Sequence, residues 1–400
     1  MTPTRNTLVL NLGSSSLKFA VIHPQTGLVA MDGLAERLGN EATFTYKKDD
    51  EKHTIELGKG AHKEAITTLI KVLEKYDLLN TLSGVGHRVV HGGEAFSESM
   101  LINKENLATL NTLNHLAPLH NPVNLLGIHA ISEQLPDIHQ VAVFDTAFHQ
   151  SMEEKAYLYA LPYELYEQHG VRRYGFHGTS YRYVSQQAAI RLEQPLTESQ
   201  FLIAHLGNGC SACAIKDGKS VDTSMGLTPL EGLPMGTRSG DLDPGLSEFL
   251  NQQLGMTQDD IMALYNKQSG LLGVSGISND MRTLQQHSEQ GDKRATLAIA
   301  LFAYKIARYL GALATNLNRI DALIFTGGIG ENDRLTRRLI IEQLAILGFK
   351  LDEQRNQQNG DELGVITNDS STRAMVIATN EEMMIALDTQ AIISKLEVGA

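Results

Sequence analysis

The 400-residue sequence has no tryptophan, only two cysteines and no run of lysine or arginine. Cys210 and Cys213 are too few for a disulfide framework, and a structural zinc site lacks its other ligands. A redox role for the pair stays open but is disfavoured, because the neighbouring residues predict a turn and a strand rather than a thiol-activating helix N-terminus. The 14 histidines show no metal-ligand spacing.

The charge balance and the hydropathy exclude several classes of partner. A formal net charge of −12 argues against sequence-independent binding to nucleic acid. The N-terminal residues lack the apolar core of a secretion signal, and no stretch approaches the roughly eighteen apolar residues of a membrane span. We therefore expect a cytoplasmic protein without a nucleic-acid or membrane partner.

Two common phosphate-binding motifs are also missing. The segment Gly13–Lys18 lacks the second glycine of a P-loop and leads into a strand instead of a helix. No complete Gly-x-Gly-x-x-Gly stands in a strand-to-helix turn. Any phosphate site must therefore differ from these two motifs.

Two similar hairpins stand out among the motifs that are present. Residues Leu8–Val21 and Ile203–Ile215 each read as two apolar strands joined by a small, polar tip, with Gly13 matching Gly207. Such a tip can direct backbone N–H groups at a phosphate. The repeat favours a duplicated fold, although two unrelated hairpins with the same turn chemistry remain an alternative.

The length and the alternation of patterns predict an α/β protein of two domains with a cleft between them. The first domain is expected at 1–148 plus about 383–400, and the second at 149–382. The predicted helices are 61–79, 104–115, 122–134, 181–192, 246–254, 258–266 and 292–317. Residues 222–244 are rich in glycine, proline and apolar residues, which favours an ordered functional loop.

Several charged side chains occupy unusual places in this pattern. Arg88 lies in a strand that looks buried, Asp145 ends another strand, and Glu381 and Glu382 follow a third, where a carboxylate pair can hold a divalent ion. His177 stands beside a predicted helix N-terminus, which suits an anion. An internal ion-pair network is the structural alternative for the arginines and Asp145.

Five segments together resemble the acetate kinase family. The two hairpin tips and the glycine turn at 326–330 match the sugar-kinase, Hsp70 and actin superfamily, in which two related ribonuclease-H-like domains clamp ATP. The segments that carry the closer resemblance run in the family's order over nearly the whole chain. They are Asn11–Lys18, Gly86–Glu94, Phe144–His149, Met235–Asp241 and Thr326–Asn332.

The resemblance implies reversible transfer of a phosphoryl group from ATP to acetate, giving acetyl phosphate and ADP. It also implies Mg²⁺, for which Mn²⁺ can substitute, and a homodimer. Propionate kinase shares nearly all the motifs and is the alternative. A more remote rival is an actin- or Hsp70-like ATPase with water as acceptor, which the arginine pair disfavours.

The resemblance also assigns roles to residues. The catalytic side chains are Asp145, His177 and Arg238. The substrate site, with Arg88 on the carboxylate, is Arg88, Val90, Leu119, His120, Phe176 and Pro229. The ATP site is Ser14, Ser16, Lys18, His205, Leu206, Gly207, Asn208, Gly209, Asp280, Met281, Arg282, Gly328, Ile329, Gly330, Glu331 and Asn332. The metal ligands are Asn11 and Glu381.

Overall fold

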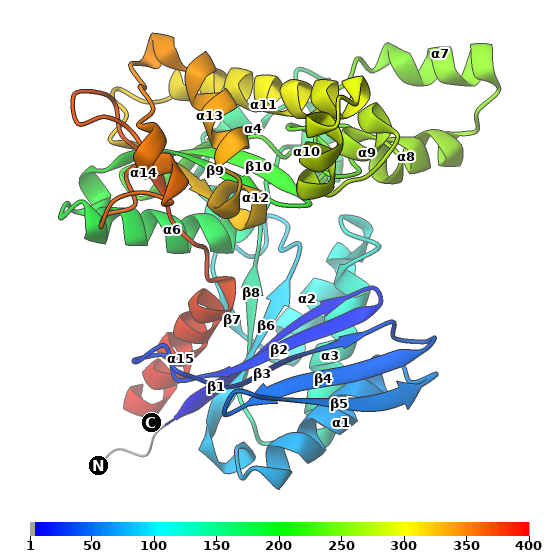
Figure 1. Ribbon diagram of the computed structural model, residues 1–400. Coiled ribbons are helices and arrows are strands. Elements are labelled where there is room, and N and C mark those ends of the chain that lie inside the picture. Colours follow the sequence, from blue (N-terminus) through cyan, green and yellow to red (C-terminus); the bar gives the residue numbers. More distant parts are fainter. Residues whose placement is uncertain (1–4, 400) are drawn as a thin grey trace. The chain divides into compact units, whose positions relative to one another are not determined.

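The computed structural model describes residues 5–399, and the side chains of residues 5–396. The chain divides into two compact units, Met1–Phe148 with Asn380–Ala400 and His149–Thr379, here called unit 1 and unit 2 (Figure 1). Residues 1–4 and 400, which the predicted first domain includes, lie outside the described residues.

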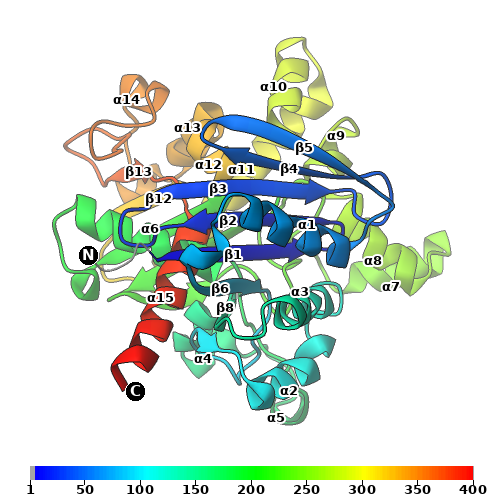
Figure 2. The same cartoon turned by 90° about the horizontal axis from the view of Figure 1, so that it is seen from below.

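Unit 1 is built on a mixed sheet of eight strands. A meander of five antiparallel strands joins, through its first strand, two strands that run parallel to that strand (Figure 2). In sheet order the strands are β5 (Glu51–Gly58), β4 (Ala42–Lys48), β3 (Val29–Glu36), β2 (Ser16–Ile22), β1 (Asn6–Gly13), β6 (Leu82–Val89), β8 (Gln140–Phe144) and β7 (Met100–Leu101).

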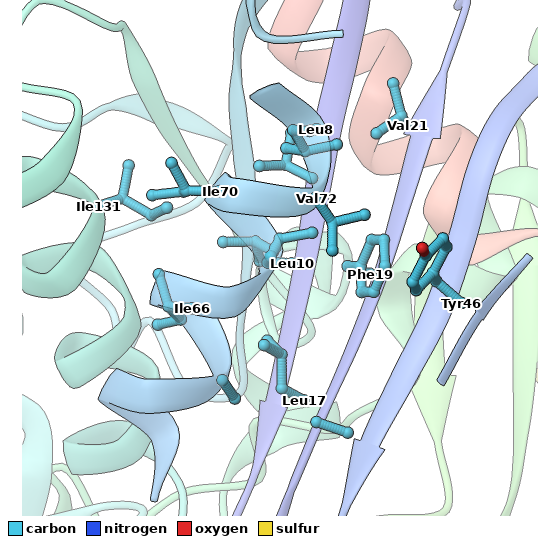
Figure 3. Packing of buried hydrophobic residues seen from close by; sticks show 14 of the residues in the cluster. Leu8, Leu10, Leu17, Phe19, Val21, Tyr46, Ile66, Ile70, Val72 and Ile131 are labelled. Carbon is cyan, nitrogen blue, oxygen red and sulfur yellow. The ribbon is translucent and has the colours of Figure 1, made fainter. Parts of the chain in front are cut away.

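Alternation along the central strands creates two cores, one on each face of this sheet. Leu8 and Leu10 of β1 point to the face covered by α1 (His62–Lys75) and α3 (Asn121–Gln134), as Figure 3 shows for the cluster around them. Val9, between them, packs instead with residues of the C-terminal helix α15 (Glu381–Gly399). Successive side chains of a strand leave by opposite faces, so both faces of β1 are buried.

The helices of unit 1 follow from the spacing of apolar residues. In α1 the buried positions recur every three or four residues, which places them on one stripe. The helix α2 (Lys104–Thr112) is capped by Asn103, whose side chain accepts from the backbone N–H groups of Glu105 and Asn106. The two helices are separate, as predicted, with Pro118 between them and Pro122 in the first turn of α3.

Unit 2 repeats the central topology of unit 1. Its sheet order is β11 (Lys219–Thr223), β10 (Cys210–Lys216), β9 (Gln200–Leu206), β12 (Ala322–Thr326) and β13 (Ala374–Val376). The first three strands are antiparallel, and the last two run parallel to β9. The order and directions equal those of β3, β2, β1, β6 and β8, so the two hairpins occupy equivalent places, as a duplicated ribonuclease-H-like fold requires.

The remaining α-helices of the described residues belong to unit 2. They are α4 (Glu154–Tyr157), α5 (Glu164–His169), α6 (Gly178–Arg191), α7 (Gly245–Leu254), α8 (Gln258–Lys267), α9 (Gly270–Ser275), α10 (Met281–Glu289), α11 (Lys293–Ala314), α12 (Gly327–Asn332), α13 (Arg334–Gln343) and α14 (Glu353–Gln357). Residues 224–244 contain no helix or strand, yet many of their side chains are buried, as expected for an ordered loop.

The helix α11 corrects one expectation. It is long and apolar enough, by length and composition alone, to cross a membrane, whereas the sequence was expected to contain no such stretch. Its apolar stripe, which includes Phe302, Ile306 and Leu310, is buried against α9, α10, α13 and the sheet. The core of unit 2 therefore accounts for its apolar character.

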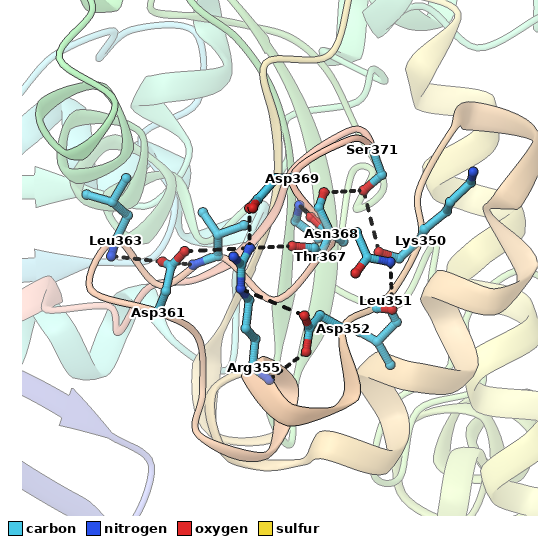
Figure 4. A network of polar contacts seen from close by, with 12 residues as sticks. Lys350, Leu351, Asp352, Arg355, Asp361, Leu363, Thr367, Asn368, Asp369 and Ser371 are labelled. Carbon is cyan, nitrogen blue, oxygen red and sulfur yellow. Dashed lines mark hydrogen bonds and ion pairs between the residues drawn. The ribbon is translucent and has the colours of Figure 1, made fainter.

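The segment between α13 and β13 is held by a polar network around Arg355 in α14 (Figure 4). The Nη1 group of Arg355 donates to Asp369 Oδ1 at 2.7 Å and to the carbonyl oxygen of Thr367 at 2.9 Å. These contacts fix a segment with little regular structure, and they lie outside the motifs of the resemblance.

Candidate functional site

In unit 1, Arg88 and Asp145 form a bidentate ion pair at the ends of two neighbouring parallel strands. Arg88 Nη2 donates to Asp145 Oδ2 at 2.6 Å, and Nε lies 3.0 Å from Oδ1. Asp145 is fully buried, and its charge is the main cause of the raised pKa of Arg88. The pair fixes the guanidinium plane and leaves Nη1 directed at Asn11 Oδ1, at 3.4 Å.

Negative charge is in excess around this pair. Three carboxylates, of Asp145, Glu381 and Glu382, meet two cations, Arg88 and Lys18, and Lys18 is paired with Glu382. Burial raises the pKa of Glu381, and the neighbouring Asp145 raises it further. A divalent cation would relieve this repulsion, and the carboxylate of Glu381 and the amide oxygen of Asn11 are the hard oxygen ligands that Mg²⁺ takes.

The protein alone does not supply a complete metal cage. Among the described residues, no group of three or more His, Cys, Asp or Glu side chains could hold a metal ion. Mg²⁺ commonly keeps several waters and binds through one or two carboxylates plus substrate phosphates, so the sparse donor set fits that ion.

The other predicted residues of unit 1 are accessible. Ser14 is exposed and Ser16 half-buried at the β1–β2 tip. Val90 is half-buried directly after β6, and its N–H donates to Asn124 Oδ1 at 3.1 Å. Leu119, at 72% exposure, and the exposed His120 precede α3. The predicted pocket wall also needs Phe176 and Pro229 of unit 2, and it stays a prediction.

Unit 2 brings Arg238 and His177 to the glycine tip of its hairpin. A methyl group built on Gly209 would lie 3.1 Å from Arg238 Nη2 and 3.6 Å from His177 Nε2. Arg238 Nη1 donates to the carbonyl oxygen of Pro229 at 2.6 Å, and burial lowers the pKa of the guanidinium. No carboxylate among the described side chains pairs with Arg238, so its charge is available to an anion.

His177 occupies a strained position at the start of α6. It is the N-cap residue with φ +60°, which is uncommon for a residue other than glycine. Its Nδ1 lies 2.7 Å from Ser211 Oγ, and its ring stacks on that of His205 at 4.2 Å between centroids. The helix begins at Gly178, three residues before the predicted start at Tyr181, because Ser180 bonds to His205 instead of capping the helix.

Sequence reasoning missed three residues that hold the loop carrying Arg238: Arg173, Tyr159 and Glu231. Arg173 Nη2 donates to Glu231 Oε1 at 2.6 Å, and Tyr159 donates to Glu231 Oε2 at 2.5 Å. Arg173 Nη1 also lies 2.8 Å from the carbonyl oxygen of Thr223. The signal for Arg173 was its place in the same short segment as His177. The signal for Glu231 was its charge inside the glycine-rich loop.

A cavity of about 720 Å³ in unit 2 gathers eight of the sixteen predicted nucleotide residues. This volume suits a nucleoside. The predicted residues that line it are Gly207, Asn208, Asp280, Met281, Arg282, Gly328, Ile329 and Asn332. Four further lining residues were not predicted, although they flank these segments: Asn279, Gln285, Asp333 and Arg334.

The other predicted nucleotide residues of unit 2 do not line this cavity. Leu206 and Gly330 are buried in the core. Glu331 turns its carboxylate inward, where Oε1 accepts from the N–H groups of Gly327 at 2.9 Å and Thr379 at 3.1 Å. Its contacts are those of a residue that positions the glycine turn. Gly209 and His205 lie on the side of Arg238 and His177.

Comparison with known proteins shows the family to which nearly the whole chain belongs. The sequence pattern of the acetokinase family matches residues 6–387. The chain belongs to the acetokinase family. An acetate kinase of Shewanella sp. strain ANA-3 is 51% identical over 393 residues, which cover 97% of this chain and 98% of the relative.

Solved structures of acetokinase members share the fold. A propionate kinase from Francisella tularensis is 46% identical with a TM-score of 0.93, and an acetate kinase from Porphyromonas gingivalis is 44% identical with the same TM-score. Both matches cover 97% of this chain and 100% of the solved chain. The chain is therefore a kinase of this family, which acts on a nucleotide and a small carboxylate.

Proposed function

We propose that this enzyme transfers the γ-phosphoryl group of ATP to acetate, reversibly, giving acetyl phosphate and ADP. The observation that carries the proposal is Arg238, a half-buried cation without a carboxylate partner among the described side chains, beside Gly209 and His177. A preorganised cation of this kind stabilises negative charge that develops as a phosphoryl group moves.

The acceptor needs no general base, since a carboxylic acid with a pKa of about 4–5 is already ionised at neutral pH. An acetate oxygen attacks the γ-phosphorus, and the new O–P bond forms as the bond to the β–γ bridging oxygen breaks and ADP leaves. Arg88 binds the acetate carboxylate, and Asp145 holds Arg88 in place. Arg238 and His177 stabilise the equatorial oxygens of the transferring group.

We propose Asn11 and Glu381 as the protein ligands of Mg²⁺, for which Mn²⁺ can substitute. The excess of carboxylates around Arg88 and the raised pKa of Glu381 support a cation there. The ion would neutralise phosphate charge. Ser14, Ser16 and Lys18 are proposed to contact the phosphates from unit 1, and the cavity of unit 2 to hold the nucleoside.

Propionate kinase is the second candidate. It is favoured by the propionate kinase among the similar solved structures, whereas the similar curated relatives are named acetate kinases. Val90 supports acetate, because a valine in the proposed pocket wall would leave less room for the acyl chain than an alanine would. An ATPase with water as acceptor would have no use for the Arg88 clamp.

The decisive experiment incubates the protein with Mg-ATP and acetate, propionate or butyrate, and traps acyl phosphate as the hydroxamate. We expect trapped product with acetate in excess of propionate. Acetate-independent release of phosphate without trapped product would refute the kinase proposal, and greater kcat/KM with propionate would favour the second candidate.

We further propose a cytoplasmic homodimer. Sedimentation equilibrium should then give twice the chain mass of 43.8 kDa. A mass that stays at that of one chain across micromolar concentrations would refute the dimer.

A further inference from the structure

Two helices of the nucleotide cavity are linked through Gln285 and Asp333. Gln285 lies on α10, and Asp333 is the N-cap residue of α13. Gln285 Nε2 donates to Asp333 Oδ2 at 2.5 Å, and both residues line the cavity. None of the family motifs described above includes either residue.

The carboxylate of Asp333 is fixed by its capping role. Its Oδ1 accepts from the N–H groups of Leu335 at 3.0 Å and Thr336 at 3.1 Å. The two bonds hold the carboxylate plane, so Oδ2 is presented to Gln285 in one orientation.

The chemistry of this contact decides the orientation of the Gln285 amide. A carboxylate only accepts hydrogen bonds, so the NH₂ group of the amide must face Asp333 and the oxygen must face away. No donor among the described residues is bonded to Gln285 Oε1. Gln285 Oε1 is therefore an oriented hydrogen-bond acceptor in the cavity wall, and a ligand can supply its donor.

We propose that Gln285 selects 6-aminopurine nucleotides, with Asp333 as its positioning residue. The exocyclic amine of adenine donates to Oε1, whereas the 6-keto group of hypoxanthine or guanine would place an acceptor against an acceptor. This inference rests on the proposed function, with ATP in the cavity. Gly207 and Gly328 also line the cavity, in the hairpin tip and the glycine turn that the proposed function assigns to the phosphates, which leaves the residues of α10 and α13 for the base.

The test compares kcat/KM for ATP and for inosine triphosphate, which differ in the purine only at the C6 substituent and the N1 proton that accompanies it. The wild type should prefer ATP by about tenfold, as expected for one oriented hydrogen bond. In Asp333→Asn the cap is retained, because asparagine caps as well as aspartate. Its amide can donate to Gln285 Oε1, which frees Gln285 to turn its NH₂ toward the cavity.

We expect Asp333→Asn to lower the ATP preference by about fivefold, through the nucleotide KM. The matched control is Asp292→Asn, since Asp292 caps α11 by accepting from Arg294 and Ala295 at 2.9 Å, away from the cavity lining. Gln285→Met removes the amide and should bring the ratio of kcat/KM for ATP to that for inosine triphosphate near one. It provides the second test if Asp333→Asn does not fold.

A wild-type preference below about twofold would overturn the inference, as would an Asp333→Asn ratio equal to that of Asp292→Asn. Equal turnover of the two nucleotides refutes only the role of Gln285. Failure to form acyl phosphate with either nucleotide refutes the proposed function itself.

Discussion

Two arginines in this protein have opposite surroundings. Arg88 is committed to Asp145 by a bidentate pair, and Arg238 meets carbonyl oxygen and glycine backbone, with no carboxylate among the described side chains. A paired arginine is held rigidly and can orient a substrate, whereas an unpaired one can stabilise charge that develops in the transition state. The difference suits one group for binding and the other for catalysis.

The first prediction concerns Arg238. Arg238→Ala should lower kcat by roughly a thousandfold and change the KM for ATP by less than about threefold, because the charge is used mainly as the phosphoryl group moves. Steady-state kinetics with the hydroxamate assay measures both. The control is Arg338→Ala, a partly exposed arginine of α13 paired with Glu342. A loss of only about threefold would refute the catalytic role.

Val90 is the second residue whose role can be measured. Arg88 and Val90 are both half-buried and flank the buried Val89, as strand alternation predicts for two side chains on one face. Val90→Ala should raise kcat/KM for propionate relative to acetate by about 10-fold or more, since one methylene is worth roughly 1–3 kcal/mol in a tight pocket. An unchanged ratio would remove Val90 from the pocket.

At the scale of elements, the turn before α6 sets the position of His177. Gly175 has φ +78°, and a methyl group there would meet Thr223 Cγ2 at 2.5 Å and the His149 ring at 2.8 Å. His149 Nε2 in turn lies 3.0 Å from the carbonyl oxygen of Phe176. The turn is therefore clamped from outside, which holds His177 in its strained conformation.

Gly175→Ala tests whether the turn is crowded, and Gly255→Ala is the control. Gly255 also has a positive φ, of +67°, but nothing lies within 4 Å of the added methyl group. Gly255→Ala should cost about 1 kcal/mol of unfolding free energy, from backbone conformation alone. Gly175→Ala should cost at least about 2 kcal/mol more and lower kcat. Equal costs by urea unfolding would show that the turn is not crowded.

At the scale of the whole molecule, the last helix completes the first unit. Ile385, Ala386 and Ile393 of α15 pack with Val9 of β1 and Val141 of β8, and Glu381 begins the same helix. A chain that ends at Thr379 should therefore lose hydrogen-exchange protection in β1, β6 and β8 while β9 and β12 keep theirs. Protection of β1 at the full-length level would contradict this prediction.

Two buried histidines, one in each unit, predict the pH dependence of stability. Burial lowers the pKa of His87 and of His149 to about 4. The unfolded state, with a pKa near 6.5, binds the extra proton, so stability is retained above about pH 6.5 and falls as the pH falls toward 4. Each histidine should lower the free energy of unfolding by about 2 kcal/mol between pH 7.5 and pH 5. Urea unfolding at the two values measures this.

The matched variant is His87→Leu. It should be less stable at pH 7.5, because Gln140 Oε1 loses the 2.8 Å bond from His87 Nε2, and its stability should depend less steeply on pH. A slope as steep as that of the wild type would show that His87 is already neutral when unfolded or still charged when folded.

The sequence by itself determined the local elements and the family. Apolar runs joined by a small, polar tip predicted the strands around Leu8 and Ile203, helical spacing predicted α1 and α11, and five motifs in order predicted the acetokinase family. These signals are local because hydrophobic periodicity and turn chemistry act within a few residues.

Only the tertiary structure decided which side chains meet. The bond between Glu231 and Arg173, the inward turn of Glu331, the start of α6 at Gly178 and the contact between Gln285 and Asp333 join residues that local patterns treat separately. Each depends on which hydrogen-bond partner a buried polar group finds, and that partner comes from packing and not from spacing along the chain.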